Sequence, residues 1–543
     1  MNRRQRRAAG KISKTAGTTS PVSTPDAVVE TGLRHFRAGQ SLEAQLCCQQ
    51  VLEAVPDHAG ALHLMGLLSL HAKQFDHAIE WITRAVRLSP TPDYLADLGS
   101  ALRQHGRHDD ALQVFVKAVQ LDPRHCGALT EAGALLNRLG RHAEALAYLD
   151  RSRDLKPDHA PTLQARAWAL YHLNRWDDSF TEARQAYERD PGNADTCNNL
   201  GLVLWRLGRN EEALPWFDKA IELRPDFAAA FVNKIISLFH LHRFQEVFAL
   251  HDRMKGLGLK HALTEWNVSL VHLLTGNFEA GWRGHQARLD LPSATYPKIP
   301  RPMWLGEQEI EGKTILVASD EGLGDTIQFV RYVPMLARRG ARVLLVVQDA
   351  LHGLLSGMDG VQQCAPMSAV SGLPPFDFHC PISSLPYAFG TRLETIPSAT
   401  SYLPLPPNAR VQAWDTRLGP RTKLRVGLVW SGSAHHMNDH NRSVSLRALS
   451  GLLDVEASFV SLQKDPRDHD AAVLRDRGDI IDHTADLHDF TETAALVSCL
   501  DLVITVDTSV AHLAAALGRP TWILLPYTPD YRWLLDRTDS PWY

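Results

Sequence analysis

The first half of the chain repeats with a period of about 34 residues. Prolines mark the period, at intervals of 34, 33, 34, 34 and 34 residues: Pro56, Pro90, Pro123, Pro157, Pro191 and Pro225. A small residue stands 24 positions before each proline: Gly32, Gly66, Gly99, Gly133, Ala167 and Gly201. Twelve positions before the prolines stand alanines, with Ser179 in the fifth unit: Ala44, Ala78, Ala111, Ala145 and Ala213. Small residues let two helices approach closely and proline ends a helix, so each unit is predicted to be a helix pair.

One unit shows the whole pattern. NNLGLVLWRLGRNEEALPWFDKAIELRPD at 198–226 has an apolar helical face, a Leu-Gly-Arg turn and a second apolar face. The pattern closely resembles the tetratricopeptide repeat, and more degenerate units continue over about 228–290. The resemblance implies a right-handed superhelix over 26–290, because each helix pair buries its face only against its neighbours. The groove of such an array usually binds a protein or peptide; a rigid spacer or a dimerisation element is the alternative.

Length, net charge and cysteine spacing exclude several classes of protein. A chain of 543 residues is expected to hold two or three domains, and its net charge of −4 argues against general nucleic-acid binding. None of the seven cysteines forms a CxxC pair, so neither a disulfide framework nor a zinc knuckle is predicted. Residues 1–25 are basic without an apolar core, which predicts a disordered tail rather than a secretory signal. The scattered cysteines favour a reducing, cytoplasmic setting, and no apolar run reaches about 18 residues, so no membrane span is predicted.

After about residue 290 the helical period gives way to short runs rich in Val, Ile and Leu. Such continuous apolar runs are typical of parallel strands covered on both faces, and helical stretches lie between them. The sequence therefore predicts an α + α/β multidomain protein, in which two Rossmann-like α/β lobes follow the repeats. The predicted boundaries are a linker at 291–312, an N-terminal lobe at 313–400, an interlobe linker at 401–422 and a C-terminal donor-binding lobe at 423–543.

A glycine-rich stretch follows the first predicted strand. DEGLGDTIQF at 320–329 comes directly after the apolar run TILVA. Ligands of parallel sheets bind at the carboxyl ends of strands, so a site is expected here. Gly322 and Gly324 permit a low turn that an acceptor can approach, and Asp325 is expected at the cleft surface, where a helix over 326–340 begins. An aspartate that only caps this helix is the alternative. The stretch fails the GxGxxG pattern, so it is no dinucleotide fingerprint.

A second motif, VITVDTSVAHLAAALGRP at 503–520, places two hydroxyl residues between a strand end and a helix. Hydroxyls and free N–H groups at a helix N-terminus favour an anion such as a diphosphate. The predicted donor contacts here are Asp507, Thr508, Ser509 and His512. A capped helix with a buried histidine is the alternative.

Two further stretches follow predicted strands. SGSAHHMNDHNRS at 431–443 is a polar loop whose phosphate or sugar contacts are predicted to be Ser431, Gly432, Arg442 and Ser443. His436 and His440 have metal-like spacing, but the Gly, Asn and Asp around them indicate a loop, so no metal site is predicted. Lys464, in SLQKDP, could give a phosphate a point charge, and a solvated surface lysine is the alternative.

In this order the motifs resemble glycosyltransferase family 9, the heptosyltransferase-like group, and its bacterial members in which that module follows tetratricopeptide repeats. The matching stretches span about 300–543 and include GLGDTIQFVRYVPMLARRGARVLL, DLVITVDTSVAHLAAALGRPTWILLP and YRWLLDRTDSPWY. The resemblance implies a GT-B fold and transfer of a sugar from a nucleotide-diphosphate donor, with neither a catalytic metal nor a cofactor.

The family's roles carry over to matching positions. Asp325 matches the acidic position that faces the acceptor and acts as general base, taking the proton of the acceptor hydroxyl. Its loop, with Gly322, Gly324 and Gln328, is predicted to lie on the acceptor side. Lys464 is also similar to the diphosphate-binding lysine of the O-linked N-acetylglucosamine transferases.

Two departures keep a rival hypothesis open. The N-terminal lobe is compact for a transferase, and the chain stops at DSPWY where relatives continue into a segment that usually packs across both lobes. The favoured function is a sugar transferase whose repeats select a protein or glycan acceptor. The alternative is a protein-interaction scaffold that carries an inactive transferase-like module.

Overall fold

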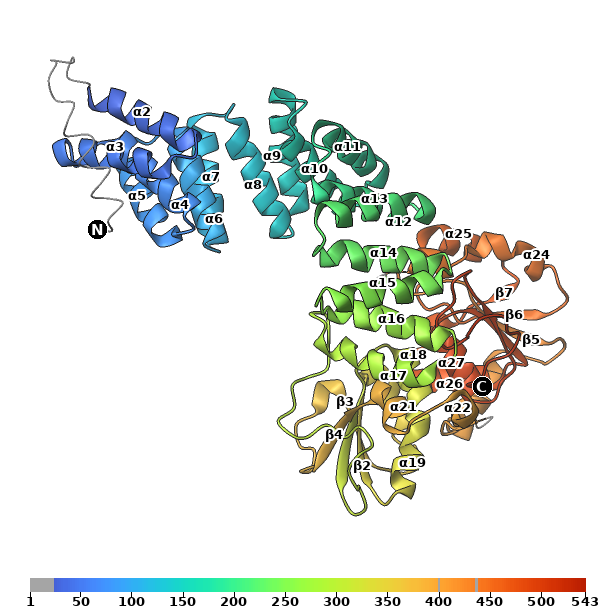
Figure 1. Ribbon diagram of the computed structural model, residues 1–543. Helices are drawn as coiled ribbons and strands as arrows, with labels where there is room; N and C mark the ends of the chain where they lie inside the picture. The colour runs from blue at the N-terminus through green and yellow to red at the C-terminus, as the bar shows by residue number, and fades with distance from the viewer. Residues whose placement is uncertain (1–23, 399–400, 435–437) are drawn as a thin grey trace. The chain divides into compact units, whose positions relative to one another are not determined.

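The computed structural model describes residues 24–398, 401–434 and 438–543 (Figure 1). Most of the tail predicted at 1–25, and His436, lie outside the described residues. The chain divides into two compact units, Met1–Lys234 and Ile235–Tyr543, and the division falls inside helix α14 (Ala228–His240).

The described part of the first unit consists of successive helix pairs and contains no strand. Its helices before α14 are α2 (Pro25–Arg37), α3 (Ser41–Ala54), α4 (Ala59–His71), α5 (Phe75–Leu88), α6 (Pro92–Gln104), α7 (His108–Leu121), α8 (Cys126–Arg138), α9 (His142–Leu155), α10 (Ala160–His172), α11 (Trp176–Arg189), α12 (Ala194–Arg206) and α13 (Asn210–Leu223). The second helix of each pair ends two residues before a periodic proline, as α3 does before Pro56 and α13 before Pro225. The predicted helical repeat array is confirmed.

The periodic small residues allow the two helices of a pair to touch. A Cβ added at Gly133 would lie 2.5 Å from Leu149 Cγ, and one added at Gly201 would lie 2.5 Å from Phe217 Cε1. Leu149 and Phe217 are fully buried, so neither can move aside into solvent. Close packing between the first and second helix therefore requires a residue without a side chain at these positions.

Replacing Gly201 should destabilise the array. In Gly201→Ala the new methyl group meets the Phe217 ring, and overpacking of this kind costs about 1–3 kcal/mol. The matched control is Gly256→Ala, because a Cβ there meets nothing within 4 Å. Urea unfolding monitored by circular dichroism should show a lower midpoint for the first variant only. Equal midpoints would contradict the packing explanation.

The second unit starts with the end of the helical array. After α14 come α15 (Phe244–Gly256), α16 (Ala262–Leu274), α17 (Phe278–His285) and the 3₁₀-helix η1 (Gln286–Asp290). Arg288 in η1 donates to Asp320, at the end of the first strand, with an Nη2–Oδ2 distance of 2.6 Å. Both side chains are almost fully buried. The last helices of the array and the first α/β domain thus share a buried ion pair.

Two parallel sheets follow. The first has the order β3-β2-β1-β4, and its strands are β1 (Thr314–Ala318), β2 (Arg342–Val347), β3 (Val361–Pro366) and β4 (Phe378–Pro381). The second has the order β7-β6-β5-β8-β9, and its strands are β5 (Arg425–Val429), β6 (Ser458–Ser461), β7 (Ile480–Ile481), β8 (Leu502–Val506) and β9 (Thr521–Leu524). All residues of β1 and β5 are buried, which confirms the predicted α/β class with parallel strands.

The helices between the strands are short. They are α18 (Leu323–Phe329), η2 (Val330–Tyr332), α19 (Val333–Arg338), α20 (Asp349–Leu355), η3 (Met367–Ala369), η4 (Ile382–Ser384), α21 (Leu385–Ala388), η5 (Leu393–Thr395), α22 (Asn408–Arg417), α23 (Asp439–Arg442), η6 (Leu446–Leu449), α24 (Ser450–Leu453), α25 (Asp468–Asp476), η7 (Thr484–Asp486), α26 (Phe490–Ser498) and α27 (Ser509–Ala516).

The helix predicted over 326–340 differs from the observed structure in two ways. It begins earlier, at Leu323, because the backbone N–H of Gly322 is bound by the Asp325 side chain in the first turn. It is also interrupted by η2 before α19, where Pro334 cannot donate a backbone hydrogen bond. Asp325 therefore lies within the first turn of α18 rather than ahead of it.

Residues 527–543, which we call the strap, hold three helices of the second unit together. Trp542 is fully buried, and its ring centroid lies 6.2 Å from that of Trp282 in α17 and 5.9 Å from that of Phe329 in α18. The Tyr543 hydroxyl lies 2.7 Å from His512 Nδ1 in α27. The strap thus contacts both α/β domains and the end of the helical array.

Helices α18 and α27, one from each α/β domain, also touch directly. A Cβ added at Gly324 would lie 2.7 Å from His512 Cδ2, so the glycine makes room for the histidine ring. The other face of that ring stacks on Trp533 of the strap, with centroids 5.4 Å apart. Burial, and secondarily the Arg331 cation, lowers the pKa of His512 to about 3.

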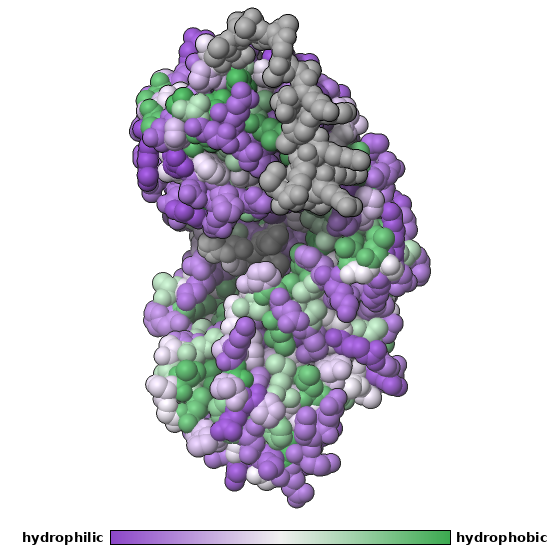
Figure 2. Space-filling model, turned by 60° about the vertical axis from the view of Figure 1, so that its left-hand side comes forward, coloured by the Kyte–Doolittle hydropathy of each residue, from purple (hydrophilic) through white to green (hydrophobic). Residues whose placement is uncertain are grey.

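The surface is mostly polar. The face in Figure 2 carries hydrophilic residues over most of its area, with apolar residues in scattered patches, as is usual for a folded surface. Among the helices of the described ranges, none combines the length and hydropathy needed to cross a bilayer.

The buried, neutral His512 should make stability depend on pH. An unfolded histidine has a pKa of about 6.5, so between that value and about 3 the unfolded state binds a proton that the folded state does not. Acidification from pH 7 therefore destabilises the fold, by up to about 1.4 kcal/mol per pH unit from this residue.

The melting temperature of His512→Gln should consequently fall less steeply than that of the wild type between pH 7 and pH 5. His488→Gln is the matched control, because His488 is exposed. Parallel pH dependences of the wild type and His512→Gln would show that His512 is accessible to protons in the folded state.

Candidate functional site

The carboxyl edge of the second sheet gathers most of the predicted donor residues. Ser431 and Gly432 follow β5, and Asp507 follows β8; these two strands are neighbours in the sheet. Lys464 follows β6, the neighbour of β5 on its other side, and is exposed. The carboxyl ends of parallel neighbours meet at one edge, so the fold brings together residues that are more than 70 positions apart in sequence.

Arg442 lies across the backbone of Gly432. A Cβ at Gly432 would be 2.6 Å from Arg442 Nη2, so only glycine leaves space for this guanidinium. Arg442 Nη1 donates to the backbone carbonyl of Asp507 at 3.0 Å, which joins the ends of β5 and β8. Its Nε is buried and has no hydrogen-bond partner. This nitrogen lies 3.7 Å from Asp439 Oδ1, so the cation is held at the sheet edge beside a carboxylate.

The two serines of this loop have different partners. Ser443 Oγ accepts from the Gly432 N–H at 2.9 Å and donates to Asp439, which itself pairs with Arg467. The Ser431 N–H donates to Gln463 Oε1 at 3.0 Å, whereas Ser431 Oγ is buried without a partner. Ser443 therefore shapes the loop, whereas the Ser431 hydroxyl has no hydrogen-bond partner.

Helix α27 begins at the end of β8 without a side-chain cap. Thr508 is its N-cap residue, but no side-chain oxygen accepts from the first turn. The Thr508 hydroxyl instead lies 3.1 Å from the Thr505 hydroxyl. The Ala511 N–H donates to the Thr508 carbonyl at 3.0 Å, and no side-chain oxygen caps the first turn, an arrangement that favours an anion at the Ser509 end of the helix.

Carboxylates crowd the region beyond β8. Burial raises the pKa of Asp507, against the opposing influences of Trp533 and Arg442. Burial also raises the pKa of Asp530 in the strap, and repulsion from Asp507 adds to that increase. Repulsion between two buried carboxylates opposes their simultaneous ionisation.

The acidic residues of DEGLGDTIQF are all engaged. Asp320 accepts from Arg288 and from the Ser383 N–H at 3.0 Å. Glu321 lies 3.6 Å from Arg288 Nε. The two oxygens of Asp325 have separate partners, because Oδ1 accepts from Arg532 Nη2 and Oδ2 accepts from the Gly322 N–H at 2.8 Å.

The residues predicted to lie on the acceptor side are buried to different degrees. Gln328 is fully buried, and its Oε1 accepts from Arg532 Nε. Gly322 is exposed as the N-cap of α18. The space over Gly324 is filled by His512, so close helix packing, rather than the approach of an acceptor, accounts for this glycine. His512 is likewise enclosed by Gly324, Trp533 and Tyr543.

Sequence reasoning missed the charged residues of the strap. Arg532 joins α18 to the strap by donating to Asp325, Gln328 and Asp530. Arg331 donates to the Trp542 carbonyl and, at 2.9 Å, to the Tyr402 hydroxyl. The available signal was the composition of YRWLLDRTDSPWY, in which arginines and aspartates alternate with aromatic residues.

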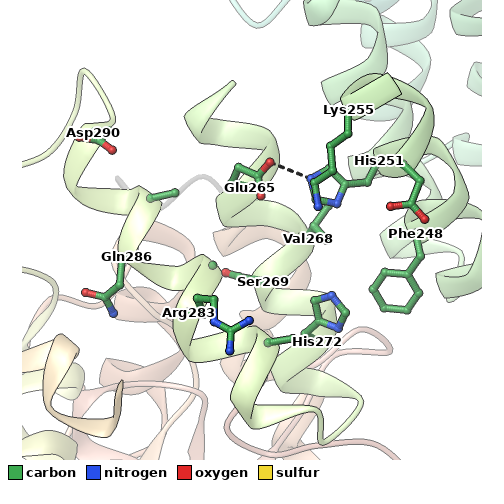
Figure 3. Close-up of a pocket in the computed structure, with 14 residues that line it drawn as sticks. Phe248, His251, Lys255, Glu265, Val268, Ser269, His272, Arg283, Gln286 and Asp290 are labelled. Atoms are coloured by element: carbon green, nitrogen blue, oxygen red, sulfur yellow. Dashed lines mark hydrogen bonds and ion pairs between the residues drawn. The ribbon is translucent and has the colours of Figure 1, made fainter. Parts of the chain in front are cut away.

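A polar pocket lies at the end of the helical array, within the second unit. It has a volume of about 580 Å³ and is lined by residues of α15, α16, α17 and η1 (Figure 3). His251 Nε2 lies 2.9 Å from Glu265 Oε1, and Phe248 stacks on His272 with centroids 4.5 Å apart. Lys255 and Arg283 add positive charge, while Asp252 and Asp290 add negative charge. The lining therefore combines charged side chains of both signs with aromatic ones.

Comparison with known families and proteins agrees with this architecture. Residues 29–91, 96–160 and 165–228 match Tetratricopeptide repeat. Residues 485–534 match Glycosyltransferase family 9 (heptosyltransferase), a range that contains β8, α27, β9 and Arg532. Protein FlbA of Caulobacter vibrioides is 25% identical over 314 residues, which covers 52% of this chain and 51% of FlbA. The chain thus spans about half the length of this curated relative.

Solved repeat proteins are similar to part of the chain. PilF of Pseudomonas aeruginosa is 18% identical with a TM-score of 0.35, over 38% of this chain and 94% of PilF. A tetratricopeptide repeat protein of Parabacteroides merdae is 14% identical with a TM-score of 0.36, over 45% of this chain and 97% of that protein. TM-scores this low support no further conclusion. The chain is a tetratricopeptide-repeat protein with a C-terminal module that matches glycosyltransferase family 9.

Proposed function

We propose that the protein is a glycosyltransferase that moves a sugar from a nucleotide-diphosphate donor to an acceptor bound by its repeats. The observation that carries this proposal is the gathering of Ser431, Arg442 and Ser509 at one sheet edge, next to the domain that holds Asp325. The family 9 match over 485–534 supports the same region as the donor side.

The donor's diphosphate would bind at the edge of β5 and β8. Arg442, Lys464 and the N-terminus of α27 supply positive charge there, and Ser431 supplies a hydroxyl without a partner. The two parallel-sheet domains would then act as the two lobes of a GT-B fold, with α18 and α27 in contact between them.

The acceptor would react beside the loop after β1. Asp325 is the proposed general base: it takes the proton of the acceptor hydroxyl as that oxygen bonds to the anomeric carbon. The bond from the anomeric carbon to the diphosphate breaks, and the electron pair leaves with the nucleotide diphosphate. The carboxylate needs no redox partner for this step.

The repeats would select the acceptor. Tetratricopeptide arrays present concave surfaces to their partners, and the pocket of α15–α17 lies in the last helices before the transferase module. Its wall η1 carries Arg288, whose partner Asp320 belongs to the same loop as Asp325. A protein or glycan chain held by the array would therefore lie against the element that anchors this loop.

A thermal-shift screen of nucleotide sugars tests the proposal and its rival. A donor that binds only the folded protein stabilises it by about 2.7 kcal/mol at 100 times its Kd, which raises the melting temperature. A matched nucleotide sugar should shift the transition more than its free sugar does. If no nucleotide sugar or nucleoside diphosphate shifts the transition, the interaction scaffold with an inactive module is the better assignment.

The donor site should depend on Arg442 and Ser509. The double variant Arg442→Met/Ser509→Ala should bind the nucleoside diphosphate about 10–100 times more weakly, because a hydrogen bond to a charged group contributes about 1.5–3 kcal/mol. Isothermal titration calorimetry measures the affinity. Arg447→Met is the matched control, since Arg447 is exposed in the same stretch of chain. Unchanged affinity in the double variant would place the diphosphate elsewhere.

Asp325→Asn should separate chemistry from donor binding. Asparagine keeps the size and helix-capping ability of the side chain but removes its basic charge, so turnover should fall by about 10²–10⁴ while nucleotide affinity stays within about threefold. Asp539→Asn controls for loss of an exposed acid, because the Asp539 side chain is 68% exposed. If Asp325→Asn has near-normal turnover, Asp325 is not the general base and only caps helix α18.

A further inference from the structure

Arg532 of the strap is the cation nearest to the proposed base. Its side chain is only 11% exposed, and each guanidinium nitrogen has an acceptor. Nη2 donates to Asp325, Nε to Gln328, and Nη1 to Asp530 at 2.6 Å. The guanidinium carbon lies 4.5 Å from the centre of the Tyr531 ring. Arginine is suited to this place because its planar fork binds several acceptors in fixed directions.

The Asp325 carboxylate is consequently held from two sides. Arg532 binds Oδ1, and the Gly322 N–H binds Oδ2 at 2.8 Å. These donors come from separate parts of the chain, the strap and the turn before α18. A carboxylate with one partner on each oxygen cannot rotate freely, and fixed orientation is a large contribution to catalysis by a general base.

We propose that Arg532 is a positioning residue for Asp325, which fixes the carboxylate plane and favours its ionised form for proton transfer from the acceptor. This role rests on the proposed function. In the reaction the proton passes from the acceptor oxygen to Asp325, and the electron pair of the broken bond leaves with the diphosphate. Arg532 neither gains nor loses a proton.

The surroundings of Asp325 explain why it needs this cation. Arg532 also pairs with Asp530 at 2.6 Å, and Asp507 and Glu321 in turn repel the Asp530 carboxylate. From α27, the neutral His512 packs at Gly324, the residue before Asp325. Arg288 in η1 pairs with Asp320 and Glu321, and Arg442 lies at the β5 edge. Burial lowers the pKa of Arg532 to about 10, so it remains a cation at neutral pH.

Removal of Arg532 would therefore take away the cation that Asp325 shares with the Asp530 carboxylate. Nearby negative charges favour protonation of a carboxylate, and a protonated base cannot accept the acceptor's proton. The acid side of the pH–rate profile is thus the property most sensitive to this residue. An arginine that only stabilises the fold would change the melting temperature when replaced, without moving the acid limb of the pH–rate profile.

The test compares three variants of the full chain: Arg532→Met, Arg532→Lys and the control Arg537→Met. Arg537 lies in the same strap and pairs with Asp539 at 2.7 Å, away from Asp325. Arg532→Met should lower kcat by about 10–100-fold, leave the donor KM within about threefold, and move the acid limb to higher pH. Arg532→Lys should regain part of kcat, because it keeps the charge but not the fork.

A double-mutant cycle tests the pairing without any activity measurement. If the two side chains interact, the melting temperature of Asp325→Asn/Arg532→Met should be no lower than that of Arg532→Met alone. Additive losses would overturn the pairing. An effect confined to the donor KM would overturn the positioning role and make Arg532 a donor ligand. Turnover that is unaffected, or an acid limb that does not move, would also overturn it.

Failure of the proposed function has a different signature. If the wild-type protein transfers no sugar from any nucleotide sugar, the transferase assignment is overturned. The positioning role of Arg532 then falls too, even if the double-mutant cycle shows coupling between Asp325 and Arg532. A second combination overturns the positioning role alone. In it the cycle shows coupling, the wild type transfers sugar normally, and Arg532→Met leaves turnover unaffected.

Discussion

The contact between α18 and α27 is the interaction on which the arrangement of the second unit depends. It exists because Gly324 has no side chain, which leaves space for the His512 ring. The strap closes over the same place: Trp533 stacks on the histidine, and Tyr543 lies within hydrogen-bonding distance of it. A residue from each α/β domain and two from the strap thus pack in one cluster, which holds α18 and α27 against each other.

Around this contact, the chain buries charges that need partners from distant segments. Burial of an isolated charge costs several kcal/mol, and the cost falls only when good partners are present. Asp320 meets Arg288 from the helical array, and Asp325 meets Arg532 from the strap. Arg331 meets the Trp542 carbonyl and the Tyr402 hydroxyl. These buried groups therefore tie the helical array and the strap to the segment that runs from the end of β1 to η2, and loss of one partner leaves the other uncompensated.

The sequence predicts the helices and strands whose residue pattern lies within one short segment of the chain. Phased glycine and proline predict the helix pairs of 26–226, and continuous apolar runs such as TILVA predict the parallel strands. Strands β3 and β4 were not predicted, because VQQCAP and FHCP carry polar residues or prolines that hide the apolar pattern. The gathering of Ser431, Arg442 and Asp507 follows from the strand-end rule. The partner of Asp325 does not, because Arg532 is about 200 positions away and its contact depends on how the strap packs.

Contacts between segments that are distant in sequence also connect the last helices of the array to the residues proposed to carry the chemistry. The second compact unit begins at Ile235, so α15–α17 belong with the α/β domains rather than with the earlier repeats. Trp282 of α17 packs against Trp542 of the strap, and Arg288 of η1 binds the loop that carries Asp325. The last helices therefore act as a structural part of the module. Under the proposed function, an acceptor bound in the pocket of α15–α17 would contact helices that are packed against the segment carrying Asp325.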